Sequence, residues 1–150
     1  MNSSGFGAVG VILAVIGWMY GSIVEDRLIG LLLGAFGLGF AVIAVPMNVD
    51  AARSIVSKSH ILAVCLGVAA WLLALARLSS KAAPDRTTKW IADGSSTLLV
   101  ATALGYVLGL WTLPVLHRLV LAVIFSWTVL TSIRLLRITA PLESTKQTKK

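Results

Sequence analysis

Long uncharged stretches alternate with short charged clusters along the chain. The longest uncharged stretches cover residues 1–24, 28–49, 59–76, 94–117 and 119–133. A helix needs about 20 predominantly apolar residues to cross a hydrocarbon core roughly 30 Å thick. Lipid offers backbone N–H and C=O groups no hydrogen-bond partners, so the spanning form must be helical. The pattern therefore predicts about five membrane-spanning helices.

The predicted helices cover approximately residues 6–24, 28–45, 60–76, 95–113 and 119–138. Pro46 is expected to close the second helix, and Pro114 the fourth. The fifth has only 15 uncharged residues between Arg118 and Arg134, so both arginines are expected to extend toward the headgroups. Residues 139–150 follow as a basic tail. The expected fold is an all-α integral membrane protein with a single helical domain.

The connections between the predicted helices are short. Residues 25–27 and 113–117 leave room only for tight turns, which predicts two antiparallel hairpins. Residues 79–95 form the one polar loop that the pattern predicts. Trp18, Trp90 and Trp111 lie near predicted helix ends, where indole rings favour the membrane interface.

Composition supports the membrane interpretation. The 150 residues are 57% hydrophobic and 13% charged, whereas soluble domains have about a quarter of their residues charged. A soluble fold of this size could not bury so much apolar surface. The single cysteine, Cys65, excludes an intramolecular disulfide.

The positions of Lys and Arg predict the orientation. With the N-terminus outside, ten of the 13 basic residues fall in cytoplasmic segments, and only Arg53, Lys58 and Arg118 lie outside. Cytoplasmic segments of membrane proteins carry the excess of Lys and Arg. We therefore expect the N-terminus outside and the C-terminus inside, in the cell (inner) membrane. The net charge of +7 belongs to these flanks and not to a nucleic-acid-binding surface, so the expected surroundings are the lipid bilayer and other membrane subunits.

Small residues recur in steps of three and four along four of the predicted helices. Helices in lipid associate through van der Waals contact, which small residues allow by letting backbones approach closely. This spacing keeps the small residues on one face, so we expect them to form helix-packing seams. The seam residues are Gly10, Ala14, Gly17, Gly21, Gly30, Gly34, Gly37, Ala41, Ala44, Ala63, Gly67, Ala70, Ala74, Gly105 and Gly109.

Candidate chemistry is sparse. Ionisable groups at mid-membrane depth usually mark transport or proton relay, and the predicted spans contain none. We therefore expect no catalytic residues and no metal centre. Two histidines, His60 and His117, open the third and fifth predicted helices at the outer face. Imidazoles from two helices can ligate the iron of a b-type haem or, together with Asp50, a metal ion, although an interfacial capping role is the commoner one for such histidines.

Three functions remain open. The first is a non-catalytic accessory subunit of a larger membrane complex, respiratory or otherwise energy-converting, which packs through the small-residue seams. The second is a small haem- or quinol-interacting module that uses His60 and His117. The third is a homo-oligomeric transporter or channel, for which the nearest polar stripe is Ser126, Thr128, Thr131 and Ser132. These four residues do not share one helix face, so the third function ranks last.

Overall fold

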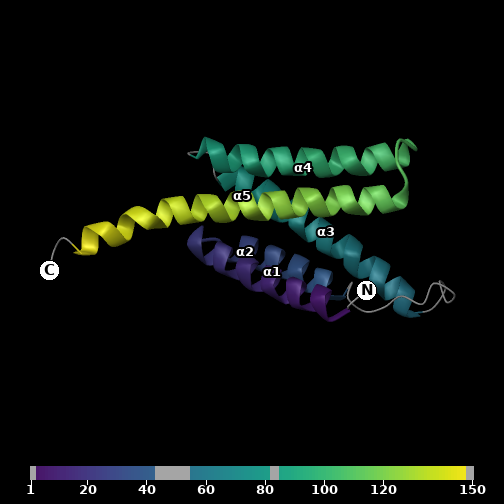
Figure 1. Cartoon of the computed structure of the whole chain (residues 1–150), viewed down its shortest axis with the longest axis horizontal. Helices are drawn as coiled ribbons and strands as arrows, with labels where there is room; N and C mark the ends of the chain where they lie inside the picture. The colour runs from purple at the N-terminus through teal and green to yellow at the C-terminus, as the bar shows by residue number, and fades with distance from the viewer. Residues whose placement is uncertain (1–2, 43–54, 82–84, 148–150) are drawn as a thin grey trace. The chain divides into compact units, whose positions relative to one another are not determined.

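The computed structural model describes residues 3–42, 55–81 and 85–147. Over these residues the chain forms five α-helices and no strands, as the hydrophobic pattern predicts (Figure 1). The helices are α1 (Ser3–Ile23), α2 (Arg27–Val42), α3 (Ile55–Lys81), α4 (Arg86–Val107) and α5 (Leu113–Gln147). The chain divides into two compact units, Met1–Leu78 and Ser79–Lys150, with the last turn of α3 in the second unit.

The helix bounds differ from the predicted ones where charges were used as limits. α3 extends past Lys58 and Arg77 in both directions, and α4 begins at Arg86, nine residues before the predicted start. Charged residues mark where a helix leaves an apolar layer, but Lys and Arg are good helix formers and do not end the helix itself. Most of the predicted polar loop at 79–95 is therefore helical, whereas residues 43–45 of the predicted second helix lie outside the described residues.

Pro114 begins a helix and does not end one. α4 stops at Val107, and α5 starts at Leu113 with Pro114 as its second residue. Proline is favoured in the first turn because its missing N–H would have no intrahelical partner there, and its fixed φ suits a helix. The prediction that Pro114 closes the fourth helix is thus wrong, and the fifth helix starts six residues earlier than predicted.

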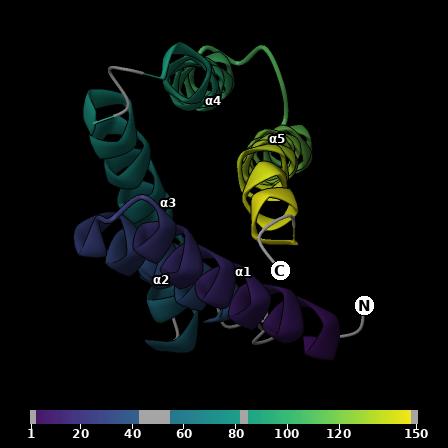
Figure 2. The same ribbon diagram turned by 90° about the vertical axis from the view of Figure 1, so that its left-hand side faces the viewer.

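In the first unit, α1 and α2 form an antiparallel hairpin with very close backbones (Figures 1 and 2). A Cβ atom added to Gly37 would lie 2.3 Å from the backbone nitrogen of Ala14, and one added to Gly10 would lie 2.4 Å from that of Ala41. At the turn, a Cβ on Gly21 would lie 2.3 Å from the Cα of Gly30. These distances are far below van der Waals contact, so the helices approach as they do only because these positions lack side chains.

α3 packs on a different face of α2. The Phe36 ring lies 6.3 Å from that of Trp71, which is fully buried, and a Cβ on Gly39 would lie 3.0 Å from the carbonyl oxygen of Ala63. Tilted aromatic pairs at this spacing add to the stabilisation from area burial. α2 therefore lies between α1 and α3, with glycines on both faces.

The second unit is the α4–α5 hairpin. Asp85 caps the start of α4, and Gly109 ends it with a φ of +74° in the left-handed region. The N–H groups of Gly109 and Leu110 donate to the carbonyls of Tyr106 and Gly105, which is the Schellman arrangement at a helix C-terminus. Trp111 then folds back over Gly105 and donates from Nε1 to the Thr102 carbonyl at 3.0 Å.

Two of the helices are long and apolar enough to cross a membrane, judged by length and composition over the described residues. The stretches are Lys58–Lys81 and Leu113–Arg137. Gly7–Ile23 and Arg27–Val42 are apolar but shorter, and the first turns of α4 are polar. The structure thus gives weak support for a membrane location, and the five-span arrangement remains a prediction.

Candidate functional site

The polar groups of the first unit meet at Asp26, where α1 turns into α2. Its carboxylate is buried, with the residue 4% exposed. Oδ1 accepts hydrogen bonds from the backbone N–H groups of Leu28 and Ile29, at 3.0 and 3.2 Å, and so caps α2. Oδ2 accepts from Nε of Arg77 at 2.9 Å. Helix N-terminus and guanidinium together compensate the burial of this charge, and the pair ties α3 to the α1–α2 turn.

Asp85 occupies the corresponding place in the second unit. It accepts from the Thr87 backbone N–H and the Thr88 hydroxyl, and both of its oxygens face the guanidinium of Arg134 on α5. The hydrogen bond from Arg134 holds the pKa of Asp85 at about 2, below its ordinary value of 3.8. The bidentate pair therefore remains ionised at neutral pH and joins the start of α4 to the later part of α5.

The two clusters share one arrangement, which we call the Asp–Arg clasp: Asp26 with Arg77, and Asp85 with Arg134. In each, an Asp-Arg dipeptide begins a helix, the aspartate caps that helix, and the partner arginine comes from the following helix. The partners are 51 and 49 residues apart in the sequence. Each clasp fixes the register of a helix pair; neither contains a nucleophile or a general acid–base pair.

A third polar contact extends the charged end of the second unit. Lys89 donates to Asp93 at 2.8 Å and to the hydroxyl of Ser79 at 2.9 Å. The hydrogen bond from Lys89 lowers the pKa of Asp93. Lys89 and Asp93 are both about half exposed, so solvent screens their interaction and it contributes little to stability.

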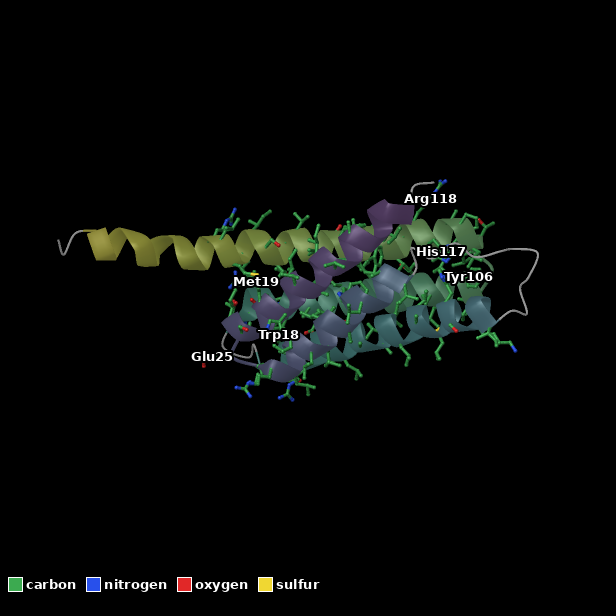
Figure 3. All side chains as sticks on the ribbon, turned by 90° about the horizontal axis from the view of Figure 1, so that it is seen from below. Trp18, Met19, Glu25, Tyr106, His117 and Arg118 are labelled. Carbon is green, nitrogen blue, oxygen red and sulfur yellow. The ribbon has the colours of Figure 1, made fainter. Side chains whose placement is uncertain are left out.

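A cavity of about 310 Å³ opens beside the first clasp, at the α1–α2 turn. Its lining consists of Trp18, Gly21, Ser22, Glu25, Asp26, Arg27 and Gly30. Glu25 has a φ of +53°, the left-handed conformation that Gly109 adopts at the end of α4. Trp18 and Glu25 both lie at the turn end of α1 (Figure 3). The cavity is small and bordered by both signs of charge, which suits a small polar group better than a large apolar cofactor.

The structure places the two histidines in different units. His60 lies in the second turn of α3, partly buried, and its Nδ1 makes no hydrogen bond to any residue that the structure describes. His117 lies in the first turns of α5 and is exposed. Among residues 3–42, 55–81 and 85–147 no cluster of three metal-ligating side chains occurs.

The predicted seam residues fall into three groups. Gly10, Ala14, Gly17, Gly21, Gly30, Gly37 and Ala41 lie where α1 meets α2. Ala63 and Gly67 face α2: the Ala63 carbonyl oxygen lies 3.0 Å from a Cβ added to Gly39, and Phe36 and Gly39 lie within 4 Å of a Cβ added to Gly67. Ala74 is buried. A Cβ added to Gly34 would have one neighbouring atom within 4 Å, Ala70 is partly buried, and Ala44 lies outside the described residues.

Two positions at the end of α4 differ from the seam that the spacing predicts. Gly105 lies under the ring of Trp111 and not against another helix, with ring atoms closer than 3 Å to an added Cβ. Gly109 lies beyond the end of α4, and a Cβ there would meet nothing within 4 Å. Its role is conformational, because few side chains tolerate a positive φ.

Sequence reasoning missed Gly39 and both clasps. Gly39 lies off the α2 seam chosen from the spacing, because α2 uses a second face toward α3. The sequence does indicate where the clasps lie: Asp-Arg occurs at 26–27 and again at 85–86, and aspartate is a preferred N-cap residue. Comparison with protein-family models, with curated proteins and with solved structures finds no match. Over the described residues the fold is all-helical, and each of its two units contains one Asp–Arg clasp.

Proposed function

We propose that this chain is a multi-pass integral membrane protein, with the N-terminus outside and the C-terminus inside, and that it serves as a non-catalytic subunit of a larger membrane complex. The observation that carries the proposal is the exposure of large apolar side chains on all five helices. Ile12, Leu38, Leu66, Leu98 and Leu136 are each more than half exposed. Soluble proteins rarely expose so many large apolar side chains, whereas lipid or partner subunits would cover them.

The distribution of charge supports the orientation. In the first unit the Asp26–Arg77 contact brings the α1–α2 turn and the end of α3 to the same end. In the second unit the Asp85–Arg134 contact does so for the start of α4 and the later part of α5. If successive helices cross the membrane in alternating directions, both clasps lie on the cytoplasmic side. That side then carries ten of the 13 basic residues.

The small-residue seams favour a packing role. The glycines of α1 and α2 are used within the chain, so a partner subunit would meet the large apolar side chains of the outer faces. α5 presents more such surface than α3, because 11% of its most apolar stretch is buried against 28% in α3. The basic end of the chain, with Lys146, Lys149 and Lys150, adds a surface for anionic lipid or an acidic partner.

Particle mass tests this proposal. Membranes that contain the chain at its natural abundance would be solubilised in a mild detergent and separated by size. We expect the chain to migrate with other polypeptides at a mass well above its own 15.9 kDa. A lone chain with its detergent belt would contradict the role as a subunit. Release from membranes by alkaline washing without detergent would contradict the membrane location.

A second function is favoured by one observation. His60 Nδ1 is buried without a hydrogen bond among the described residues, and a buried unsatisfied nitrogen calls for an explanation such as an unseen ligand. A b-type haem with His60 as an axial ligand would supply one. An absorption spectrum of the purified protein tests this second function. A spectrum without a haem band would contradict it.

A further inference from the structure

The cavity at the α1–α2 turn has two charged side chains without partners on its border. Glu25 and Arg27 both line the cavity and are exposed, and neither side chain forms an ion pair or hydrogen bond within the described part of the chain. Asp26 between them is different, because its oxygens are taken by Arg77 and by the α2 backbone. The cavity therefore offers one free negative and one free positive group.

The conformation of Glu25 is a second observation. Its N–H donates to Ser22 and the N–H of Asp26 donates to Gly21, the same Schellman pattern that ends α4. At the left-handed position of that pattern α4 has Gly109, whereas α1 has Glu25 at φ +53°. A side chain with a Cβ is disfavoured there relative to glycine. Strain that is retained at a cavity is a reason to look for a function of the side chain.

The charges of the turn place this cavity at headgroup depth. Glu25, Asp26 and Arg27 separate the uncharged stretches 1–24 and 28–49, so in the membrane arrangement proposed above the turn lies where the hydrocarbon core ends. Trp18, which lines the cavity and is 59% exposed, has the amphipathic side chain that favours this depth.

We propose that the α1–α2 turn is a binding site for a zwitterion that carries a primary ammonium and a phosphate, the headgroup chemistry of phosphatidylethanolamine. The ammonium donates to the carboxylate of Glu25, and the phosphate accepts from the guanidinium of Arg27. The site's small volume admits such a headgroup, and its paired charges disfavour a purely anionic one. This inference rests on the membrane location proposed above.

Lipid binding to the full-length protein in detergent tests the site. Native mass spectrometry would follow titration with phosphatidylethanolamine, phosphatidylcholine and phosphatidylglycerol. Phosphatidylethanolamine should bind most tightly, because the choline group cannot donate hydrogen bonds and the glycerol headgroup lacks a cation. Glu25→Gln should weaken phosphatidylethanolamine about tenfold and phosphatidylcholine distinctly less, because choline loses an electrostatic attraction but no hydrogen bond. Arg27→Gln should weaken both lipids.

Two controls separate binding from folding. Arg86→Gln alters the arginine that follows the other capping aspartate, and it should leave the lipid preference intact. Glu25→Gly removes the carboxylate and the backbone strain together, so it should unfold at a higher temperature than the native chain yet lose the preference. A variant that is more stable and no longer selective cannot be explained by misfolding.

A soluble competitor identifies the source of the zwitterion. Displacement of the lipid by millimolar O-phosphoethanolamine would identify the headgroup alone as the ligand, and selectivity without displacement would identify the intact lipid. Equal binding of the three lipids, or native selectivity in Glu25→Gln, would overturn the site. If the protein needs detergent for extraction but shows no headgroup preference, the lipid site is contradicted and the proposed function is not. If alkaline washing without detergent extracts it, the proposed function is contradicted.

Discussion

Replacing Gly37 by alanine should separate α1 from α2, whereas the same change at Gly34 should not. A Cβ at position 37 would lie 2.3 Å from the Ala14 nitrogen, 2.6 Å from its Cα and 2.8 Å from the Gly10 carbonyl oxygen. All three atoms are backbone and cannot move aside. At Gly34 the nearest atom is the Ala14 carbonyl oxygen, 3.9 Å away, which is ordinary contact.

Overpacking and helix propensity have opposite effects on the stability of Gly37→Ala. Favourable carbon contacts lie at about 3.5–4.0 Å, so an alanine at 37 must push the helices apart by more than about 1 Å. Overpacking of this kind costs about 1–3 kcal/mol, and the separated helices also lose dispersion contacts. The helix propensity of alanine over glycine returns at most about 1 kcal/mol. Gly37→Ala should therefore be clearly destabilising, while Gly34→Ala should be neutral or slightly stabilising.

Thermal unfolding of the purified protein in one detergent is the assay, with both variants prepared in parallel. Gly94→Ala provides a further control, because an added Cβ there meets nothing within 4 Å. We expect Gly37→Ala to melt several degrees below the native protein, and the other two variants at or above it. Equal melting temperatures at 34 and 37 would show that the close α1–α2 approach does not exist.

Three further variants test the turns and clasps. Glu25→Gly should raise the unfolding free energy by about 0.5–1 kcal/mol by relieving a positive φ, and Gly109→Ala should lower it by about 1 kcal/mol; unfolding in denaturant checks both signs. Asp26→Ala should lower the unfolding free energy by about 2 kcal/mol, because it removes the helix cap and the buried ion pair. Asp93→Ala should lower it by less than about 0.5 kcal/mol, because its ion pair is exposed. Similar losses in the two variants would refute the importance of burial. Because the pKa of Asp85 is lowered from 3.8 to about 2, its contribution is complete above pH 3.8 and is lost as pH falls through 2; Asp85→Asn should remove that part of the acid dependence of the melting temperature.

The helix count followed from the sequence, but the helix ends did not. Uncharged stretches separated by charge clusters predicted five helices, and the structure has five over its described residues. α4 shows why the predicted helix bounds were wrong. The charged residues of its first turns indicate a loop, although Asp85 is a capping residue and helix-forming residues follow it. Pro114 was assigned to the wrong helix, because proline near a boundary is compatible with an end or a start.

The candidate site depended on contacts between distant positions. The spacing of small residues selected most of the positions at which α1 and α2 meet, but it did not indicate which helix each seam faces. The clasp arginines, Arg77 and Arg134, were interpreted as membrane flanks, and a partner about 50 residues away is not visible in a periodic pattern. The positive φ of Glu25 could not be predicted either, because glutamate is not a residue that indicates a turn.

Impermeant thiol labelling of sealed, right-side-out vesicles tests the central claim, the five-span topology, most directly. Single cysteines would be introduced in a Cys65→Ser background at Ser3, Ser57, Val115, Ser80 and Ser144. We predict that cysteines at positions 3, 57 and 115 react from outside, and that those at 80 and 144 react only after the vesicles are opened. Labelling of position 144 in sealed vesicles would contradict the account, because it would require an even number of spans or an inverted orientation.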